Sequence, residues 1–226
     1  MSFAAEPSEP APQPPAGLLA RLRTDPVHAP EHIALAAADV HAPAAARWAG
    51  ERRAEGRYSP YTLGEMARKR HASLASVSGA ATGVGGLVTM IPDLVSLAWL
   101  QSRMVFFVAG AFGWDPFDPM RPAELLALTR LHHDPASARA ALDGLQGSSS
   151  VAAHWVGSRL QRDERMASKL FVMVGKKAGK SIAGRMIPGF AIGYNAAANR
   201  NETNKLGRRA VAFYSQVPQL TPAPPR

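Results

Sequence analysis

The sequence predicts an all-α protein with a single helical domain, and three observations lead to this fold class. No stretch alternates apolar and polar residues over the length that a half-buried β-strand requires. Ser59-Pro60 pairs an N-cap residue with a proline at the first helical position, which is a start signal of helices. The apolar stretch 72–114 has Asp93 and Arg103 as its only charged residues, so we expect it to be buried.

The two ends of the chain differ from the rest in composition. Residues 1–16 are rich in Pro, Ala and Glu and contain almost no large apolar side chains, which predicts a disordered tail. Residues 218–226 are rich in proline and should form a second loose tail. We therefore expect the helical domain to extend over residues 17–217, and we detect no internal repeat in it.

Several helices are predicted ahead of the apolar stretch. The first is a short helical piece at 17–23. The Ala- and Arg-rich segment 30–56 should form two helices that meet at Pro43, because proline removes a helical hydrogen bond. A further helix begins at Ser59-Pro60 and continues through the basic run 68–70 into the apolar stretch.

The apolar stretch has a first half of small residues and a bulky second half. The glycines of the first half are Gly79, Gly83, Gly85 and Gly86. Pro92 and Asp93 separate the halves, which indicates that one helix ends there and that another begins with Asp93 as its N-cap. We therefore predict a Gly-rich helical hairpin over 72–114 at the core of the domain.

The rest of the chain is also predicted to be helical after a turn. Residues 115–122 contain three prolines, and Asp115 and Asp118 precede two of them as turn formers. The predicted elements that follow are an amphipathic helix at 123–133, a short helix from Asp134-Pro135 to about Gly144, a long helix at 151–185 and a last helix at 189–216.

Positive charge is concentrated in the last third of the chain. Residues 1–150 contain 13 Lys+Arg and 14 Asp+Glu, a net charge of −1, whereas residues 151–226 contain 13 and 3, a net charge of +10. Basic residues between 162 and 180 recur at helical spacing opposite an apolar face, which is typical of a helix that lies on anionic lipid. A solvated charged face on a core helix is the alternative. The residues that we expect to contact an anionic surface are Arg162, Arg165, Lys169, Lys176, Lys177 and Lys180.

Two runs of small residues, Gly79–Gly83 and Gly189–Ala197, allow close approach of another helix. Residues four apart share a helix face, so each run lets a second backbone come near. We expect the two runs to pack on each other, with Asn195 and Asn199 supplying hydrogen bonds near the contact. Packing in a soluble bundle explains these glycines, and insertion of 72–91 into lipid is the alternative.

The sequence contains no catalytic or metal-binding pattern that stands out. The segment 170–181 imitates a P-loop, but the spacing from Gly175 to Gly179 is one residue too short. His132 and His133 diverge by about 100° on a helix and do not chelate one ion together. The chain has no cysteine, which excludes disulfides and thiol catalysis. We therefore predict no cofactor and no metal, and favour a non-enzymatic protein.

Motifs in both halves of the chain resemble the EcsC family. They are ASVSGAATGVGGLVTMIPDL at 75–94, GWDPFDP at 113–119 and IPGFAIGYNAAAN at 187–199, and the resemblance covers 63–214. It implies a cytoplasmic, largely helical bacterial protein, associated with the membrane or its transporters and without an established enzymatic activity. The family's motif residues correspond to Gly79, Gly83, Gly86, Pro92, Asp93, Arg103, Asp115, Pro188, Gly189, Gly193 and Asn199.

These observations predict a membrane-associated helical protein that binds anionic lipid, or a membrane or transporter partner, through its basic last third. The N-terminus lacks the basic region and apolar core of a signal peptide, so we expect a cytoplasmic protein at the inner face of the cell membrane. One alternative is a lipid-acting hydrolase with a polar site near Asp93 and Arg103. Another is a nucleic-acid-binding protein, although few aromatic side chains are available for stacking. Oligomer formation is compatible with the sequence.

Overall fold

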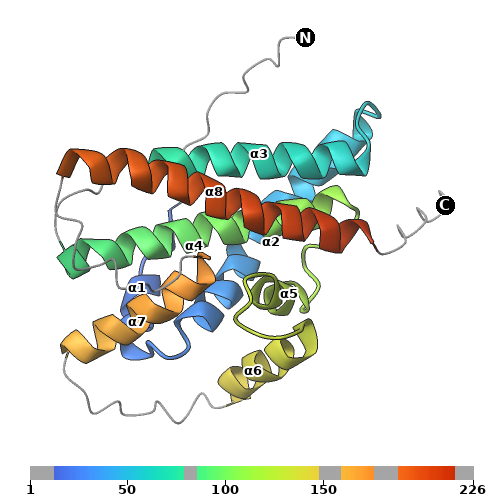
Figure 1. Ribbon diagram of the computed structural model, residues 1–226. Helices are drawn as coiled ribbons and strands as arrows, with labels where there is room; N and C mark the ends of the chain where they lie inside the picture. The colour runs from blue at the N-terminus through green and yellow to red at the C-terminus, as the bar shows by residue number, and fades with distance from the viewer. Residues whose placement is uncertain (1–12, 79–85, 148–158, 176–187, 217–226) are drawn as a thin grey trace.

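The computed structural model describes residues 13–78, 86–147, 159–175 and 188–216. Within these residues the chain forms eight helices and no strand, so the predicted all-α fold class is confirmed (Figure 1). The helices are α1 (Leu18–Thr24), α2 (Ala29–Ala54), α3 (Pro60–Ser78), α4 (Gly86–Ala111), α5 (Arg121–Leu128), α6 (Pro135–Gly147), α7 (Arg159–Met173) and α8 (Pro188–Ser215).

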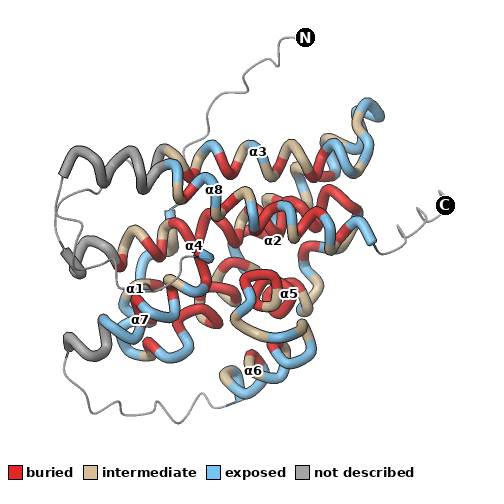
Figure 2. Tube along the Cα trace, in the orientation of Figure 1, coloured by how far each residue is buried: buried red, intermediate tan, exposed pale blue. Residues whose placement is uncertain are grey.

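The central element of the fold is α4. It contacts α2, α3, α7 and α8 along its length and α5 near its end, and Figure 2 shows buried residues along most of it. The largest of its fully buried side chains are Ile91, Leu97, Trp99, Leu100, Met104 and Phe106. Burying one such side chain contributes about 1.5–3 kcal/mol, so α4 supplies much of the apolar core.

One helix of the described part of the chain is long and apolar enough to cross a membrane. It is the segment 91–111 of α4, and nearly all of it is buried against other helices. A core helix of a soluble protein has the same length and composition. Insertion of the stretch 72–91 into lipid was the alternative prediction. This stretch does not form one helix in the described residues: it includes the end of α3, the start of α4 and residues outside the described part.

Both helix divisions that were predicted at prolines are wrong. Pro92 lies inside α4 and Pro43 lies inside α2, so Asp93 is not an N-cap. A proline in a helix interior costs about 3 kcal/mol. Continuing α4 through Pro92 keeps Ile91 and Leu94 in the same buried face as the following turns, which offsets that cost. The predicted hairpin over 72–114, with its division at Pro92, is therefore wrong in its bounds. Two helices do pack on each other here, but they are α3 and α4, and the segment 79–85 between them lies outside the described residues.

Other predicted helix boundaries are confirmed by hydrogen bonds. The backbone N–H of Thr62 donates to Oγ of Ser59 over 3.1 Å where α3 begins. The N–H of Ser137 donates to Oδ1 of Asp134 over 2.8 Å where α6 begins. Between α4 and α5, Asp115 accepts from the N–H of Phe117 over 2.9 Å, as expected of a turn former.

Two helices end earlier than predicted because a residue takes a left-handed backbone conformation. Arg130, with φ of 66°, follows the end of α5 at Leu128, five residues before the expected end at His133. Gly175, with φ of 79°, follows the end of α7 at Met173. The predicted helix over 151–185 therefore stops before Gly175. The predicted tails, 1–16 and 218–226, lie almost entirely outside the described residues.

Candidate functional site

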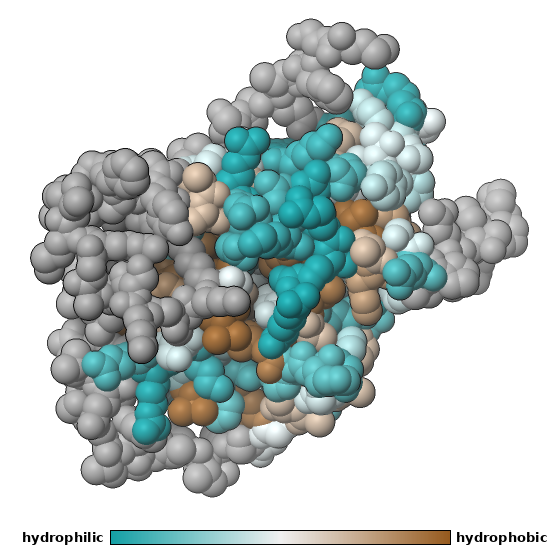
Figure 3. Space-filling model, viewed as in Figure 1, coloured by the Kyte–Doolittle hydropathy of each residue, from teal (hydrophilic) through white to brown (hydrophobic). Residues whose placement is uncertain are grey.

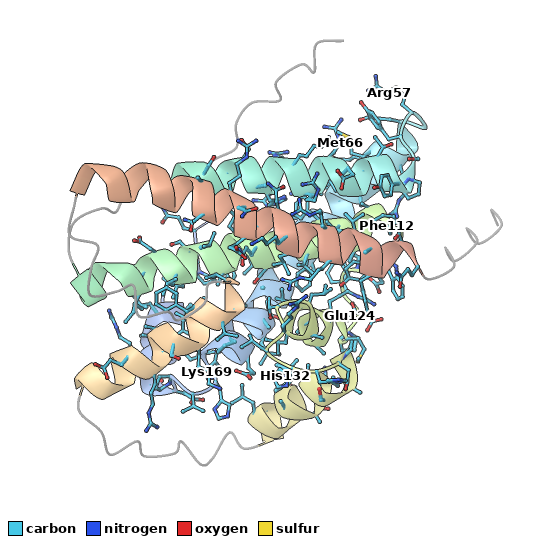
Figure 4. All side chains as sticks on the ribbon, in the orientation of Figure 1. Arg57, Met66, Phe112, Glu124, His132 and Lys169 are labelled. Carbon is cyan, nitrogen blue, oxygen red and sulfur yellow. The ribbon has the colours of Figure 1, made fainter. Side chains whose placement is uncertain are left out.

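The described part of α7 has the two faces that the sequence predicted. Arg165 and Lys169 are exposed, whereas Met166, Leu170 and Met173 are buried (Figure 4). The apolar face packs on α4, α2 and α1. Because that face is covered by protein, α7 presents to its surroundings mainly the polar face. The side chain of Arg162 and the residues Lys176, Lys177 and Lys180 lie outside the described part.

A second basic surface lies on the exposed side of α3 and α8, which pack against each other. Figure 3 shows hydrophilic side chains gathered over this side of the molecule. Glu65 and Glu202, the acidic residues of this surface, accept bonds of 2.7 Å from Arg68 and Lys205 respectively. Sequence reasoning missed this surface because its two helices are 110 residues apart at their nearest ends, although the basic run 68–70 was a visible signal. The exposed cations of this α3/α8 basic surface are Lys69, Arg200, Lys205 and Arg208.

The motif residues of α4 do not form one small site. Asp93 and Arg103 are both half-buried, and they lie ten positions apart in one helix, which is about 15 Å along the axis. The guanidinium of Arg103 lies 4.8 Å from the centre of the Phe107 ring. Asp115 is exposed in the turn after α4. A compact polar pocket that joins Asp93 to Arg103 is therefore not formed by these side chains alone.

Arg103 lies instead beside two buried histidines from other helices. His41 of α2 and His71 of α3 are each 2% exposed, and their rings contact Trp99 and Phe107 at centre-to-centre distances of 4.3 and 5.3 Å. Nδ1 of His71 donates to the carbonyl of Ala67 over 2.7 Å. Burial, and then the positive charge of Arg103, lowers the pKa of His41 to about 3, and burial is likewise the largest cause that lowers the pKa of His71 to about 3.

Both histidines are therefore neutral in the folded protein near pH 7. The sequence did not predict a role for these two histidines, because a single histidine in a helix forms no recognisable motif with its neighbours. Their position, between the helices that pack on α4, makes them part of the core. Nε2 of His41 has no hydrogen-bond partner among the described residues.

A buried ionic cluster joins α5 to the end of α8. Oε2 of Glu124 accepts hydrogen bonds from Nη1 of Arg121 and from the hydroxyl of Tyr214 (Glu124 is labelled in Figure 4). Nη2 of Arg121 also reaches Asp118 at 3.1 Å, and its guanidinium lies over the ring of Trp114. Burial raises the pKa of Glu124 although Arg121 opposes this shift. These contacts fix the orientation of α8, which carries three of the four exposed cations of the α3/α8 basic surface.

Asn199 is the motif residue of α8 whose side chain the structure describes. It is 7% exposed, and one turn later Thr203 accepts a hydrogen bond of 3.2 Å from Nε2 of Gln101 on α4. The predicted contact between the two small-residue runs falls largely outside the described part. Gly79 and Gly83 are outside it, and of Gly86, Pro188, Gly189 and Gly193 only the helical backbone is described.

No group of three or more metal-ligating side chains occurs in the part of the chain that the structure describes. His132, which the sequence considered for a metal, lies 3.3 Å from Oε1 of Glu31 on α2. The exposed His133 lies 3.3 Å from Asp134.

The fold and the exposed charges together define an all-α protein with an apolar central helix and basic outer surfaces. The chain belongs to the EcsC protein family, whose family model matches residues 61–216. This range begins in the first turn of α3 and ends just after α8, so it includes both basic surfaces but neither α1 nor α2. Searches of curated proteins and of solved structures found no match.

Proposed function

We propose that this protein is a non-enzymatic, membrane-associated helical protein that binds anionic lipid or an acidic membrane partner through its basic last third. One observation carries the proposal. Among the cations of the last third whose burial is described, all except the half-buried Arg209 are exposed on α7 and α8, while apolar residues of the same helices are buried. The exposed cations are Arg165, Lys169, Arg200, Lys205 and Arg208, and the acidic residues beside them are Glu164 and Glu202.

The proposed contact is peripheral and electrostatic. Each Lys or Arg near an anionic membrane surface contributes about 1 kcal/mol, so several together give reversible binding that salt weakens. The apolar face of α7 packs on α1, α2 and α4, and the apolar segment of α4 is enclosed by other helices. Neither of these two apolar surfaces can enter lipid unless the helices that cover it move apart. The cytoplasmic leaflet, which carries anionic lipid, is the surface that fits this charge.

Co-sedimentation with vesicles tests the proposal. The protein should bind anionic vesicles at low salt and dissociate from them at high salt, and it should not bind neutral vesicles. The double variant Arg165→Glu/Lys169→Glu should bind at least several-fold less, because it replaces two surface attractions by two repulsions. Arg57→Glu is the matched control for the single variants Arg165→Glu and Lys169→Glu, since Arg57 is also exposed but lies at the opposite corner of the molecule from Lys169 (Figure 4).

Each other outcome has a distinct meaning. Binding that persists at high salt would replace the peripheral contact by insertion into lipid. Equal losses in Arg57→Glu and in either α7 single variant would show that total charge, and not the last third, determines binding. If no vesicle is bound, the membrane proposal is wrong, and copurified DNA or RNA would then favour nucleic acid as the anionic partner.

A further inference from the structure

The helix α2 covers the one segment of the described residues that is long and apolar enough to cross a membrane, 91–111 of α4. The ring of Trp48 on α2 lies 5.3 Å from the ring of Phe107 on α4, measured between ring centres. One turn further on, a Cβ built on Gly110 would lie 3.2 Å from Cβ of Ala49. The two helices are therefore in direct contact over the second half of this segment.

The face with which α2 covers α4 consists mostly of small side chains. Six of the ten buried residues of α2 are alanine, and Ile33 is the only large aliphatic residue among them. An alanine buries one methyl group, so this contact contributes less hydrophobic free energy than a leucine-rich contact of the same length. Pro43 also removes one hydrogen bond from the interior of α2. The attachment of α2 to α4 is therefore weak for a helix of 26 residues.

The contact between α2 and α4 also contains buried polar atoms that lack partners. The rings of His41 and Trp99 lie 4.3 Å apart between their centres. Neither Nε2 of His41 nor Nε1 of Trp99 has a hydrogen-bond partner in the part of the chain that the structure describes. Both residues are at most 2% exposed. A buried polar atom without a partner is unfavourable, and separation of the two helices removes this penalty.

Acid weakens the same contact. Burial and then the charge of Arg103 on α4 lower the pKa of His41 to about 3, and His71 on α3 acts in the same direction. The described residues of α1, α5 and α7, which also pack on α2, contribute no such group. From pH 7.5 to pH 5.0 the equilibrium for exposing His41 rises about thirtyfold, because only the exposed ring takes up a proton.

We propose that the surface of α4 beneath α2 binds the hydrocarbon of an anionic bilayer, and that α2 covers this surface until acid releases it. The inference rests on the proposed membrane association, because the exposed cations of α7 and α8 bring the protein to the bilayer. Lipid fits the composition of the segment 91–111, whose only charged residues are Asp93 near its start and Arg103. The long side chain of an arginine reaches the headgroups while its stem stays in an apolar layer.

A disulfide between α2 and α4 provides a reversible lock for the first experiment. The chain has no cysteine, so the variant Ala49→Cys/Gly110→Cys forms a single intramolecular bond. The 3.2 Å between the two Cβ positions is a few tenths of an ångström below the range of disulfides, about 3.5–4.5 Å, so a small shift permits the bond. At pH 5.0 and high salt, the reduced form should sediment with phosphatidylglycerol vesicles, and the oxidised form should do so at least several-fold less.

A second variant loosens α2 instead of locking it. Trp48→Ala removes the contact with Phe107, so the fraction of protein that stays on these vesicles at high salt should rise several-fold at pH 6. Phe213→Ala is the matched control, because Phe213 is also a half-buried aromatic residue but belongs to α8, where it contacts Tyr214. Urea unfolding of both variants compares their losses of stability. The control should bind as wild type does.

The outcomes separate this inference from the proposed function. If wild type binds anionic vesicles only at low salt, at pH 7.5 and at pH 5.0, the proposed function stands and this inference is overturned. If wild type binds at pH 5.0 in high salt but shows no binding at pH 7.5, the peripheral contact fails and the covered lipid surface is supported. Equal binding of the oxidised and reduced forms overturns the inference. Equal gains in Trp48→Ala and Phe213→Ala also overturn it, because general loosening of the fold would then explain insertion.

Discussion

The hydroxyl of Tyr214 donates a 2.7 Å hydrogen bond to Oε2 of Glu124, and this contact joins two helices that are 90 residues apart in sequence. Tyr214 is 1% exposed and Glu124 is 6% exposed, so water does not compete for the bond. The same carboxylate oxygen also accepts from Arg121. The end of α8 is therefore fixed on α5 by a hydrogen bond between two buried groups, and water cannot take the place of either partner.

Tyr214→Phe should lower the free energy of unfolding by about 1–2 kcal/mol, because a buried carboxylate loses one hydrogen bond. The phenylalanine ring retains the edge contacts with Trp114 and Phe213. Urea unfolding followed by circular dichroism measures the change. A loss below about 0.5 kcal/mol, smaller than one ordinary hydrogen bond, would mean that this contact does not hold α8 in place.

Stability should fall as the pH falls below about 6.5, because His41 and His71 are held neutral in the folded state. Their folded pKa of about 3 lies below the unfolded value of 6.5, so below pH 6.5 the unfolded state binds more protons. The stabilisation is complete above pH 6.5, and by pH 5 each histidine should have lost about 2 kcal/mol of it.

Urea unfolding at pH 7.5 and pH 5.0 checks this dependence. The groups that oppose protonation are Arg103 for both histidines, Arg70 for His71, and His71 itself for His41. The free energy of unfolding of the double variant His41→Gln/His71→Gln should change much less between the two pH values than that of wild type, whatever its absolute value. An unchanged pH dependence in that variant would show that other groups cause the acid sensitivity.

Two helical glycines should respond in opposite directions to alanine. A Cβ on Gly207 of α8 would clash with Cγ of Arg68 and lie 3.0 Å from Sδ of Met104, so Gly207→Ala should destabilise by about 1–3 kcal/mol. Gly50 of α2 is exposed with nothing within 4 Å of such a Cβ, so Gly50→Ala should stabilise by up to about 1 kcal/mol. Thermal unfolding of both variants measures the contrast. A stabilised Gly207→Ala would contradict the close approach of α8 to α3 and α4.

Arg130→Gly should raise the free energy of unfolding by about 1 kcal/mol, because glycine adopts the left-handed conformation without the Cβ penalty. Thermal unfolding is the measurement. A destabilised variant would mean that contacts of the arginine side chain stabilise the fold by more than the backbone strain costs.

The sequence by itself determined the fold class, most helix starts and the family. Ser59-Pro60 and Asp134-Pro135 begin helices as predicted, since capping depends on a few adjacent residues and needs no distant contact. The two faces of α7 were also predictable, because helical periodicity is local.

Tertiary structure decided the rest, and the reason is packing between distant segments. Pro43 and Pro92 predict helix ends when only the neighbouring residues are considered. In the structure α2 and α4 continue through these prolines, because residues on both sides of each proline are buried in the core. The histidine cluster around Arg103 combines three helices, and the hydrogen bond from Tyr214 to Glu124 joins positions 90 residues apart. Residue spacing along a chain does not specify such contacts, because they arise only where separate helices pack on a common core.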